Sequence, residues 1–389
     1  MKKDWEIKKL GEVCNFQNGF SFKSNLFTKD GLPILRISNI QNEGISLEDI
    51  VYFDINSYSV DFEKYKVFPN EIVIAMSGGT TGKIGRNNTN SIFYLNQRVG
   101  KFIPLDNLND CYLYYYLLTK NEESLRIAAG AAQPNLSTEQ INNFLLPVPP
   151  LEEQKRIVKI LDEKFAQLET IKTNAQTNLQ NAKDLFQSQL TKAFSNTTWE
   201  KKRLDEVCGI TSKLVDPTLP EYLDLYHVGG ANIESETGVL LDLKTSKEEG
   251  LSSGKFTFDE SMVLYNKIRP YLKKVARPDF AGLCSADMYP LNPKNNITKD
   301  YLYYILISDD FTKYAISKSD RAGMPKVNRE ALFAYECYLP HLPEQKRIVK
   351  ELDALSEKVR QLQEIYTKQI ANCDELKQSY LQKTFEGEL

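Results

Sequence analysis

Glu153-Gln154-Lys155-Arg156-Ile157-Val158-Lys159 recurs without change as Glu344 to Lys350, 191 positions further along the chain. Other segments repeat at nearly the same offset: Trp5 to Cys14 resembles Trp199 to Cys208, Tyr112 to Tyr115 matches Tyr301 to Tyr304, and Leu185, Ser188, Leu190, Lys192 and Phe194 return as Leu376, Ser379, Leu381, Lys383 and Phe385. Self-similarity at a fixed offset marks a duplicated structural unit. The chain of 389 residues is therefore two copies of one unit, each a globular part of about 145 residues followed by a helix of about 45.

The two copies differ inside their globular parts. The segment Gly78-Gly79-Thr80-Thr81-Gly82-Lys83 stands where the second copy has Lys267-Ile268-Arg269-Pro270-Tyr271-Leu272-Lys273-Lys274. A tandem protein that keeps its framework and varies its loops is expected to recognise two different things. The alternative is drift after duplication without a change of function.

A proline cluster precedes each helical segment, because proline is tolerated at the start of a helix but not inside it. We expect long helices at 151–196 and 342–389. Apolar residues recur in steps of three and four along both helices, as in a coiled-coil seam. They are Ile157, Leu161, Leu168, Ile171, Ala175, Ala182 and Leu185 in the first, and Ile348, Leu352, Leu355, Val359, Leu362, Tyr366, Cys373, Leu376 and Tyr380 in the second. The simplest arrangement is an antiparallel pair, which gives a molecule with a pseudo-twofold internal repeat. The alternatives are that each helix packs on its own globular part or associates between chains.

The globular parts, residues 1–150 and 197–341, are expected to be β-rich mixed α/β (α+β) domains. Strand patterns outnumber helical ones, and glycine-rich turns separate them. The expected strands are 32–40, 71–76, 92–95, 99–103, 223–228 and 262–268, with one helix per copy near Cys111–Lys120 and Asp300–Ile307.

The composition excludes several classes of protein. No apolar run reaches the roughly 20 residues of a membrane span, and the charged segment Met1 to Leu10 does not resemble a signal peptide. The six cysteines are scattered without a CxxC pair, which favours reduced thiols in a cytoplasmic protein and no zinc site. The net charge is −3, so any DNA binding must use local patches or partner subunits.

One acid-free basic stretch occurs at the same place in each copy, at Ile72–Leu105 and at Met262–Pro278. Lysine and arginine in such stretches are suited to DNA phosphates, and amide, hydroxyl and guanidinium groups are suited to base edges. The predicted DNA-binding residues are Ser77, Thr80, Thr81, Lys83, Arg86, Asn96, Gln97, Arg98 and Lys101 in the first copy, and Asn266, Lys267, Arg269, Tyr271, Lys273, Lys274 and Arg277 in the second. The alternative is an ordinary solvated hairpin.

Catalytic motifs are missing from the sequence. The tract from Gly78 to Lys83 has the wrong spacing for a phosphate-binding P-loop, and Ile84 follows where serine or threonine is required. The two histidines, His227 and His341, lie in different regions and give little support for acid–base or metal chemistry. No Asn-Pro-Pro-aromatic or Asp-Pro-Pro-aromatic tetrapeptide of an amino-methyltransferase is present.

The chain resembles the specificity subunits of type I restriction–modification systems over essentially its whole length. The resemblance lies in Trp5 to Leu10, Leu35 to Ile40, Ser77 to Gly85, Leu95 to Val99 and Leu146 to Ile157, and in Val228 to Ile233, Arg269 to Leu272, Cys284 to Asp287 and Glu344 to Ile348 of the second copy. Singly these motifs are weak, but their doubled order, each time followed by a long helix, is specific. One departure is that little sequence follows the second helix, which puts in doubt any contact of a longer tail.

The resemblance implies a non-catalytic subunit that binds double-stranded DNA. Residues 1–150 and 197–341 would be target-recognition domains, each reading one half of a split asymmetric sequence, and the helices would set the gap between the half-sites. Two modification subunits would dock on the helices and carry S-adenosylmethionine, while restriction subunits would use ATP and magnesium to cleave DNA. This subunit itself would hold no cofactor or metal and would not contact a membrane.

Three rival functions stay open at this point. A targeting subunit of another restriction class could share the same fold. A coiled-coil scaffold with two protein-binding heads would show no salt-sensitive DNA binding. An enzyme is the third, and methyl transfer by the isolated chain would support it.

Overall fold

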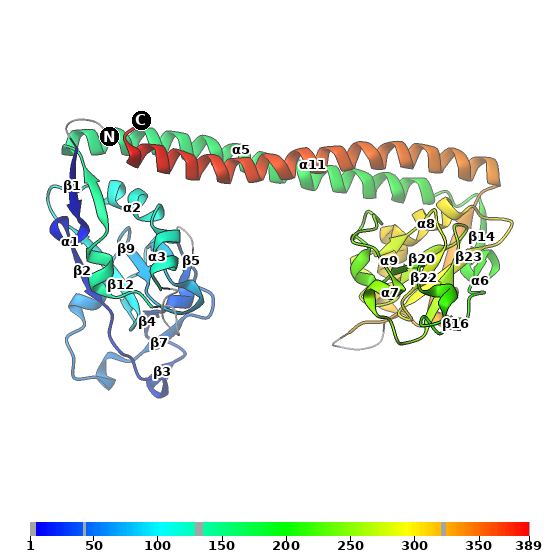
Figure 1. Ribbon diagram of the computed structural model, residues 1–389, viewed down its shortest axis with the longest axis horizontal. Coiled ribbons are helices and arrows are strands. Elements are labelled where there is room, and N and C mark those ends of the chain that lie inside the picture. The colour runs from blue at the N-terminus through cyan, green and yellow to red at the C-terminus, as the bar shows by residue number, and fades with distance from the viewer. Residues whose placement is uncertain (1–4, 42–43, 129–134, 320–323, 389) are drawn as a thin grey trace. The chain divides into compact units, whose positions relative to one another are not determined.

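The computed structural model describes residues 5–41, 44–128, 135–319 and 324–388, which form two compact units. The first unit consists of Met1–Asn174 and Gln369–Leu389, and the second of Ala175–Lys368. Each unit thus combines one globular part with a segment of helix α5 (Leu151–Phe194) and a segment of helix α11 (Leu342–Glu386), as Figure 1 shows. The two predicted long helices are confirmed, and the domain boundaries at 150 and 341 stay predictions.

Helices α5 and α11 run antiparallel within each unit. In the first unit, the ammonium of Lys377 lies 5.1 Å from the ring centre of Phe165, and Lys172 pairs with Asp374 at 2.6 Å. In the second unit, Lys183 lines the same hollow as Arg360, whereas Lys192 lines a hollow with Arg347. A later position in α5 is therefore matched each time by an earlier position in α11.

Each globular part contains a four-stranded sheet, a five-stranded sheet and a two-stranded ribbon. In the first unit the four-stranded sheet has the order β10-β9-β12-β2, and the five-stranded sheet has the order β3-β7-β4-β11-β8. The strands are β1 (Glu6–Lys9), β2 (Cys14–Asn18), β3 (Phe27–Thr28), β4 (Leu32–Leu35), β5 (Ile40–Gln41), β6 (Gly44–Ile45), β7 (Val51–Phe53), β8 (Lys66–Val67), β9 (Ile72–Ala75), β10 (Ile84–Arg86), β11 (Phe93–Leu95), β12 (Val99–Pro104) and β13 (Leu145–Val148). The ribbon pairs β1 with β13, so it joins the two ends of the globular part.

The second unit repeats this topology with two changes: one strand adds at a different sheet edge, and an isolated bridge between Ile233 and Leu240 stands where the first unit pairs β5 with β6. Its sheets have the orders β15-β23-β20-β21 and β16-β19-β22-β17-β18, and its ribbon pairs β14 with β24. The strands are β14 (Glu200–Arg203), β15 (Cys208–Gly209), β16 (Leu214–Val215), β17 (Tyr226–Val228), β18 (Lys244–Thr245), β19 (Lys255–Phe258), β20 (Val263–Asn266), β21 (Val275–Ala276), β22 (Gly282–Cys284), β23 (Met288–Pro293) and β24 (Glu336–Leu339). Because β4 and β11 correspond to β17 and β22, the fifth strand, β3 or β16, adds to opposite edges of the two sheets.

The four-stranded sheet is the middle layer of each globular part. Alternate side chains of a strand point to opposite faces. Ile72 and Ile74 of β9 pack into the core that also holds α2 and α5, whereas Val73 and Ala75 pack against the five-stranded sheet. This explains why β9 is apolar at every position: both of its faces are buried.

Short helices complete the two globular parts. They are α1 (Leu10–Val13), α2 (Asp110–Leu118), α3 (Asn121–Ala128) and α4 (Thr138–Asn142) in the first, and α6 (Leu204–Val207), α7 (Ser246–Glu249), α8 (Lys299–Ile307), α9 (Asp309–Ser317) and α10 (Arg329–Phe333) in the second. The predicted helices at Cys111–Lys120 and Asp300–Ile307 correspond to α2 and α8. The prediction of a single helix per copy was wrong, because α3 and α9 follow directly after them.

The repeated glutamine of the Glu-Gln-Lys-Arg-Ile motif joins each long helix to its globular part. Gln154 and Gln345 are both fully buried. The Gln345 side chain accepts a hydrogen bond from the Thr298 N–H and donates to the carbonyls of Asn296 and Pro340 at 2.9 Å each. Gln154 makes the same three bonds, to the Asn109 N–H and to the carbonyls of Asn107 and Pro149. The identity of this motif in the two copies thus has a structural cause.

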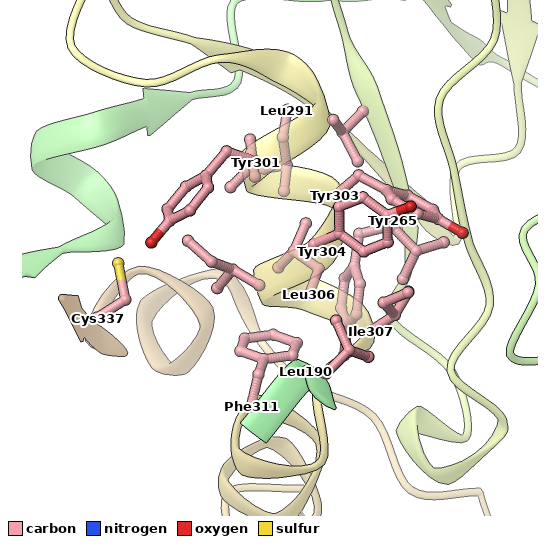
Figure 2. Packing of buried hydrophobic residues seen from close by; sticks show 14 of the residues in the cluster. Leu190, Tyr265, Leu291, Tyr301, Tyr303, Tyr304, Leu306, Ile307, Phe311 and Cys337 are labelled. Atoms are coloured by element: carbon pink, nitrogen blue, oxygen red, sulfur yellow. The ribbon is translucent and has the colours of Figure 1, made fainter. Parts of the chain in front are cut away.

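The helical seam is only partly as predicted. Ile157, Leu161, Ile348, Leu352 and Val359 are buried, but the expected seam residues Ile171, Leu185, Leu362 and Leu376 are exposed. The buried positions in their place are Phe186, Leu190 and Leu381. Leu190 enters the core of the second unit, and Leu381 enters that of the first (Figure 2 shows Leu190 within its cluster). Each long helix therefore packs on a globular core as well as on the other helix, which a two-helix pattern does not anticipate.

The predicted strand at 32–40 is interrupted. Strand β4 ends at Leu35, and a helical turn at Ile37–Asn39 follows because the buried Asn39 bonds the backbone around it. Its amide accepts from the Arg36 N–H and donates to the carbonyls of Ser46 and Glu48. In the second copy Asn232 bonds Gly229, Leu241 and Asp242 in the same way. The predicted strands at 223–228 and 262–268 are also shorter than expected, at Tyr226–Val228 and Val263–Asn266.

Candidate DNA-binding surface

In the first unit, three segments distant in sequence meet beyond the end of β9. The Met76 N–H donates to the carbonyl of Arg98, and the Leu136 N–H donates to the carbonyl of Met76, both at 2.8 Å. Ser77 also forms a β-bridge with Asn135. Across this frame the Arg98 guanidinium donates to the Asn135 amide oxygen at 2.6 Å. The result is an exposed pair of hydrogen-bonding side chains on a backbone fixed from both sides.

The second unit builds the same frame beyond the end of β20. The Lys267 N–H donates to the carbonyl of Asp287 at 3.1 Å, and the Val327 N–H donates to the carbonyl of Lys267 at 3.0 Å. Ile268 forms the β-bridge with Lys326, and the Arg269 N–H donates to the Pro325 carbonyl. Equivalent backbone bonds therefore present different side chains in the two units.

Cations gather at this place in the second unit. The Lys267 ammonium bonds the Ala286 carbonyl, lies 3.7 Å from a carboxylate oxygen of Asp287 and stands 5.1 Å from the ring centre of Tyr289. Arg329 lies over the same ring, and Lys326 and Arg329 are exposed. Burial lowers the pKa of Lys267, and the charge of Lys326 adds to this effect while Asp287 opposes it. The exposed cations Lys326 and Arg329 make this place suited to an anion such as a phosphate.

Three of the predicted lysines direct their ammonium groups to partners inside the domain. Lys101 is 5% exposed and pairs with Glu71 at 3.0 Å, Lys273 is 8% exposed and pairs with Asp309, and Lys274 bonds the Gly230 carbonyl. These contacts disfavour the predicted role of the three lysines at DNA, and for Lys101 and Lys273 the physical reason is a carboxylate partner. A stretch free of acids in the sequence still meets acids from other elements in the fold.

Arg86 and Arg277 anchor the sheet to neighbouring elements. Arg277 pairs with Asp300 of α8 at 2.7 Å and with Asp353 of α11 at 2.6 Å. Burial alone would lower its pKa, but these carboxylates outweigh burial and hold the pKa above its usual range. Arg86 bonds the Asn70 carbonyl and the sulfur of Cys111, which occupies the place of Asp300. We therefore infer that both arginines stabilise the fold.

The remaining predicted residues divide by exposure. Thr81 and Asn266 are buried, and Thr81 donates to the Gly78 carbonyl at 2.6 Å. The side chains that are at least partly exposed are Ser77, Thr80, Lys83, Asn96, Gln97, Arg98, Arg269 and Tyr271. Thr80 donates to the Ile37 carbonyl, which leaves its hydroxyl oxygen to accept. These eight stay as predicted DNA contacts, whereas Lys267 is 9% exposed, nearly as buried as Asn266, and its ammonium bonds a carbonyl of its own unit.

Sequence reasoning missed Asn135, Asp287, Lys326 and Arg329. All four lie outside the two basic stretches, and Asn135 and Asp287 carry no positive charge. A usable signal was present, because Asn135-Leu136 and Lys326-Val327 are separated by the repeat offset of 191.

Within the part of the chain that the structure describes, no group of three or more histidine, cysteine, aspartate or glutamate residues is placed to hold a metal ion. Over those residues there is also no helix with the length and apolar character of a membrane span. The six cysteines are free thiols.

The fold and this surface define a tandem recognition protein, and the sequence comparison gives its family. Residues 2–179 and 196–370 match the family described as the type I restriction modification DNA specificity domain, and the chain belongs to that family. It is a DNA sequence-recognition subunit of the type I restriction–modification class.

Relatives support this assignment along the whole chain. The chain is 28% identical to the type I restriction enzyme EcoDI specificity subunit of Escherichia coli, over 99% of this chain and 89% of the relative. It is 24% identical to the StySPI specificity subunit of Salmonella potsdam, with the same coverage.

Two solved structures share the fold. One is a chain of the structure described as "Structural basis underlying complex assembly and conformational transition of the type I R-M system", with a TM-score of 0.78, 20% identity and coverage of 100% of this chain and 99% of that one. The other is the HsdS subunit from Thermoanaerobacter tengcongensis, with a TM-score of 0.55, 20% identity and coverage of 100% and 98%.

Proposed function

We propose that the chain reads a bipartite, asymmetric DNA target, with one recognition domain for each half-site. The observation that carries this proposal is the pair of equivalent backbone frames beyond β9 and β20, which present different side chains. Because the framework is duplicated, each copy is suited to bind one segment of duplex DNA. The different side chains on the two copies are suited to contact different bases. The long helices would then set the distance between the half-sites.

Two kinds of contact are expected at each frame. Exposed cations, such as Lys326 and Arg329, would neutralise phosphates and give affinity that falls with salt. Arginine, asparagine and glutamine side chains, such as Arg98, Asn135 and Gln97, would reach base edges in the major groove. The net charge of −3 fits this division if partner subunits supply further phosphate contacts.

We propose that the chemistry resides on partner subunits and that this subunit is non-catalytic and cytoplasmic. Modification subunits would bring S-adenosylmethionine, and restriction subunits would bring the ATP- and magnesium-dependent cleavage. The proposal rests on membership of the specificity family and on the sequence, which lacks a methyltransferase tetrapeptide and a phosphate-binding loop.

Two repeat-related sets of exposed apolar residues are proposed to dock two modification subunits. Ile171 and Leu376, next to the Lys172–Asp374 ion pair, are 40% and 47% exposed in the first unit. Leu362 and Leu185, at the repeat-equivalent positions, are 38% and 49% exposed in the second. Leu185 also lines a hollow of about 610 Å³ between α5 and α11. Equivalent surfaces in two copies are suited to two molecules of the same partner.

Replacing Arg269 by alanine is expected to weaken binding of the cognate duplex by about 5- to 150-fold, as for the loss of a base-contacting arginine worth about 1–3 kcal/mol. Fluorescence anisotropy of the assembled complex at several salt concentrations measures this. Lys247→Ala removes the same charge from an exposed position of α7 and is the matched control. Undiminished binding by the Arg269 variant would remove this residue from the interface, and binding of the wild type that ignores both salt and sequence would favour the protein-scaffold alternative.

Replacing Leu185 and Leu376 together by alanine is expected to weaken capture of modification subunits by at least about fivefold, since each removes exposed apolar area at an interface. Analytical ultracentrifugation of the two-component mixture gives the stoichiometry. Lys368→Ala, on the exposed surface of α11, is the control. An unchanged assembly with two modification subunits would show that these leucines lie outside the docking surface.

A further inference from the structure

The two recognition domains place opposite charges at one equivalent position. Arg98 lies three residues after the end of β11, and Asp287 lies three residues after the end of β22. The carbonyl of Arg98 accepts a hydrogen bond from the N–H of the residue that follows β9, and the carbonyl of Asp287 accepts one from the N–H of the residue that follows β20. The preceding turns also correspond. The Asn96 N–H donates to the Leu35 carbonyl in the first unit, and the Ser285 N–H donates to the Val228 carbonyl in the second. The equivalence thus rests on hydrogen bonds within each unit, and it holds although the side chains share no chemistry.

The side chains at this position differ in what they can recognise. Arg98 is exposed and has only donors, and among the residues that the structure describes its guanidinium donates to Asn135. The Asp287 side chain is 61% exposed and, when ionised, has only acceptors. A donor is complementary to the O6 and N7 atoms of guanine, and a carboxylate is complementary to an exocyclic amino group, as of cytosine or adenine.

We propose that Arg98 and Asp287 are specificity-determining residues, the first selecting a base with acceptors on its major-groove edge and the second a base with an exocyclic amino group. This inference rests on the proposed function, because it takes the frames beyond β9 and β20 as the DNA-reading surfaces.

Backbone geometry supports the assignment of Arg98. Its φ of +76° lies in the left-handed region, which costs a non-glycine residue roughly 1–2 kcal/mol. Glycine would fit this position with less strain. A non-glycine residue in this region is a reason to look for a role of its side chain, which here is the exposed guanidinium that bonds Asn135.

The charge balance around Asp287 supports its role. A carboxylate near DNA is repelled by phosphates, and an isolated one would weaken binding. Here Lys267 lies 3.7 Å from it, and Lys326 and Arg329 are held close to Lys267. The first unit has Met76, Asn135 and Thr138 at the positions of these three cations. The second unit thus has cations at the three positions around its acid, Asp287. The first unit, which has Arg98 in place of the acid, has uncharged residues at those positions.

The test uses the assembled complex and reads base preference directly. Genomic DNA modified by each variant is sequenced for methylated adenines, and the preferred base at each position of both half-sites is compared with the wild type. Arg98→Gly keeps the backbone geometry, and Asp287→Asn is nearly isosteric, so thermal unfolding midpoints are expected to hold. Asp279→Asn, an exposed carboxylate beyond the opposite end of β20, is the matched control.

Arg98→Gly is expected to reduce selectivity at one G·C pair of one half-site by about tenfold, and Asp287→Asn to reduce it at one pair of the other half-site. Loss at a C·G pair identifies a cytosine amino group, and loss at an A·T pair identifies that of adenine. Asp287→Arg is expected to move the preference at that pair towards guanine.

Unchanged base preferences in all three variants, with normal modification, would overturn the inference while leaving the proposed function intact. A uniform loss of affinity for every sequence would also overturn it, because it indicates a phosphate contact. A wild-type complex without a bipartite target would instead contradict the proposed function.

Discussion

Replacing Leu190 or Leu381 by alanine is expected to lower the free energy of unfolding of the affected unit by about 2–5 kcal/mol. Both side chains are fully buried, Leu190 among Phe311, Ile307 and other residues of the second core, and Leu381 in the first core. Truncation removes apolar contacts and leaves a cavity that close-packed neighbours refill only partly. Because the two leucines are repeat equivalents, the losses should be similar.

The matched controls are Leu185→Ala and Leu376→Ala, which are also repeat equivalents but lie on the exposed side of the same helices. These substitutions are expected to change stability by less than about 0.5 kcal/mol. Urea unfolding followed by circular dichroism measures all four. Equal losses for the buried and exposed pairs would contradict the packing of α5 and α11 on the two cores.

Replacing Gln345 by leucine is expected to destabilise the second unit by about 2–4 kcal/mol, because buried polar groups lose their partner. Leucine fills a similar volume but leaves the Thr298 N–H and the carbonyls of Asn296 and Pro340 without their buried partner. An unsatisfied buried polar group costs about 1–3 kcal/mol, and the three groups share a single site. Gln154→Leu should have the same effect on the first unit.

Differential scanning calorimetry of the full chain is the measurement for Gln345, since it gives the unfolding midpoint and enthalpy. Lys346→Ala, one position further along α11 on the exposed side, is the control and should leave the unfolding midpoint in place. A Gln345→Leu variant as stable as the control would show that the repeated glutamine is not required to hold helix and globular part together.

The sequence repeat was sufficient to predict the two long helices and the duplicated β-rich domains. The helical seam was predicted less well, because spacing alone treats each helix as packing against one partner. Leu185 and Leu376 fit the spacing but are exposed, whereas Leu190 and Leu381 belong to globular cores. The break in the strand at 32–40 was hidden for a similar reason: the partners of Asn39 are carbonyls seven and nine residues away.

The candidate site was predictable only where charge and exposure coincide. Arg98 and Arg269 are exposed, as expected from basic residues in an acid-free stretch. Lys273 and Arg277 are equally basic in sequence, but α9 and α11 bring Asp309 and Asp353 to them. Asp287 was overlooked because the search was for basic residues, although its equivalence to Arg98 becomes evident once the backbone bonds are known.

Mapping the adenines methylated by the assembled wild-type complex tests the central claim most directly. The account predicts one target made of two short, unrelated half-sites separated by a gap of fixed length and arbitrary sequence. A single uninterrupted target, or two half-sites identical in sequence, would contradict a chain in which two equivalent frames read different bases.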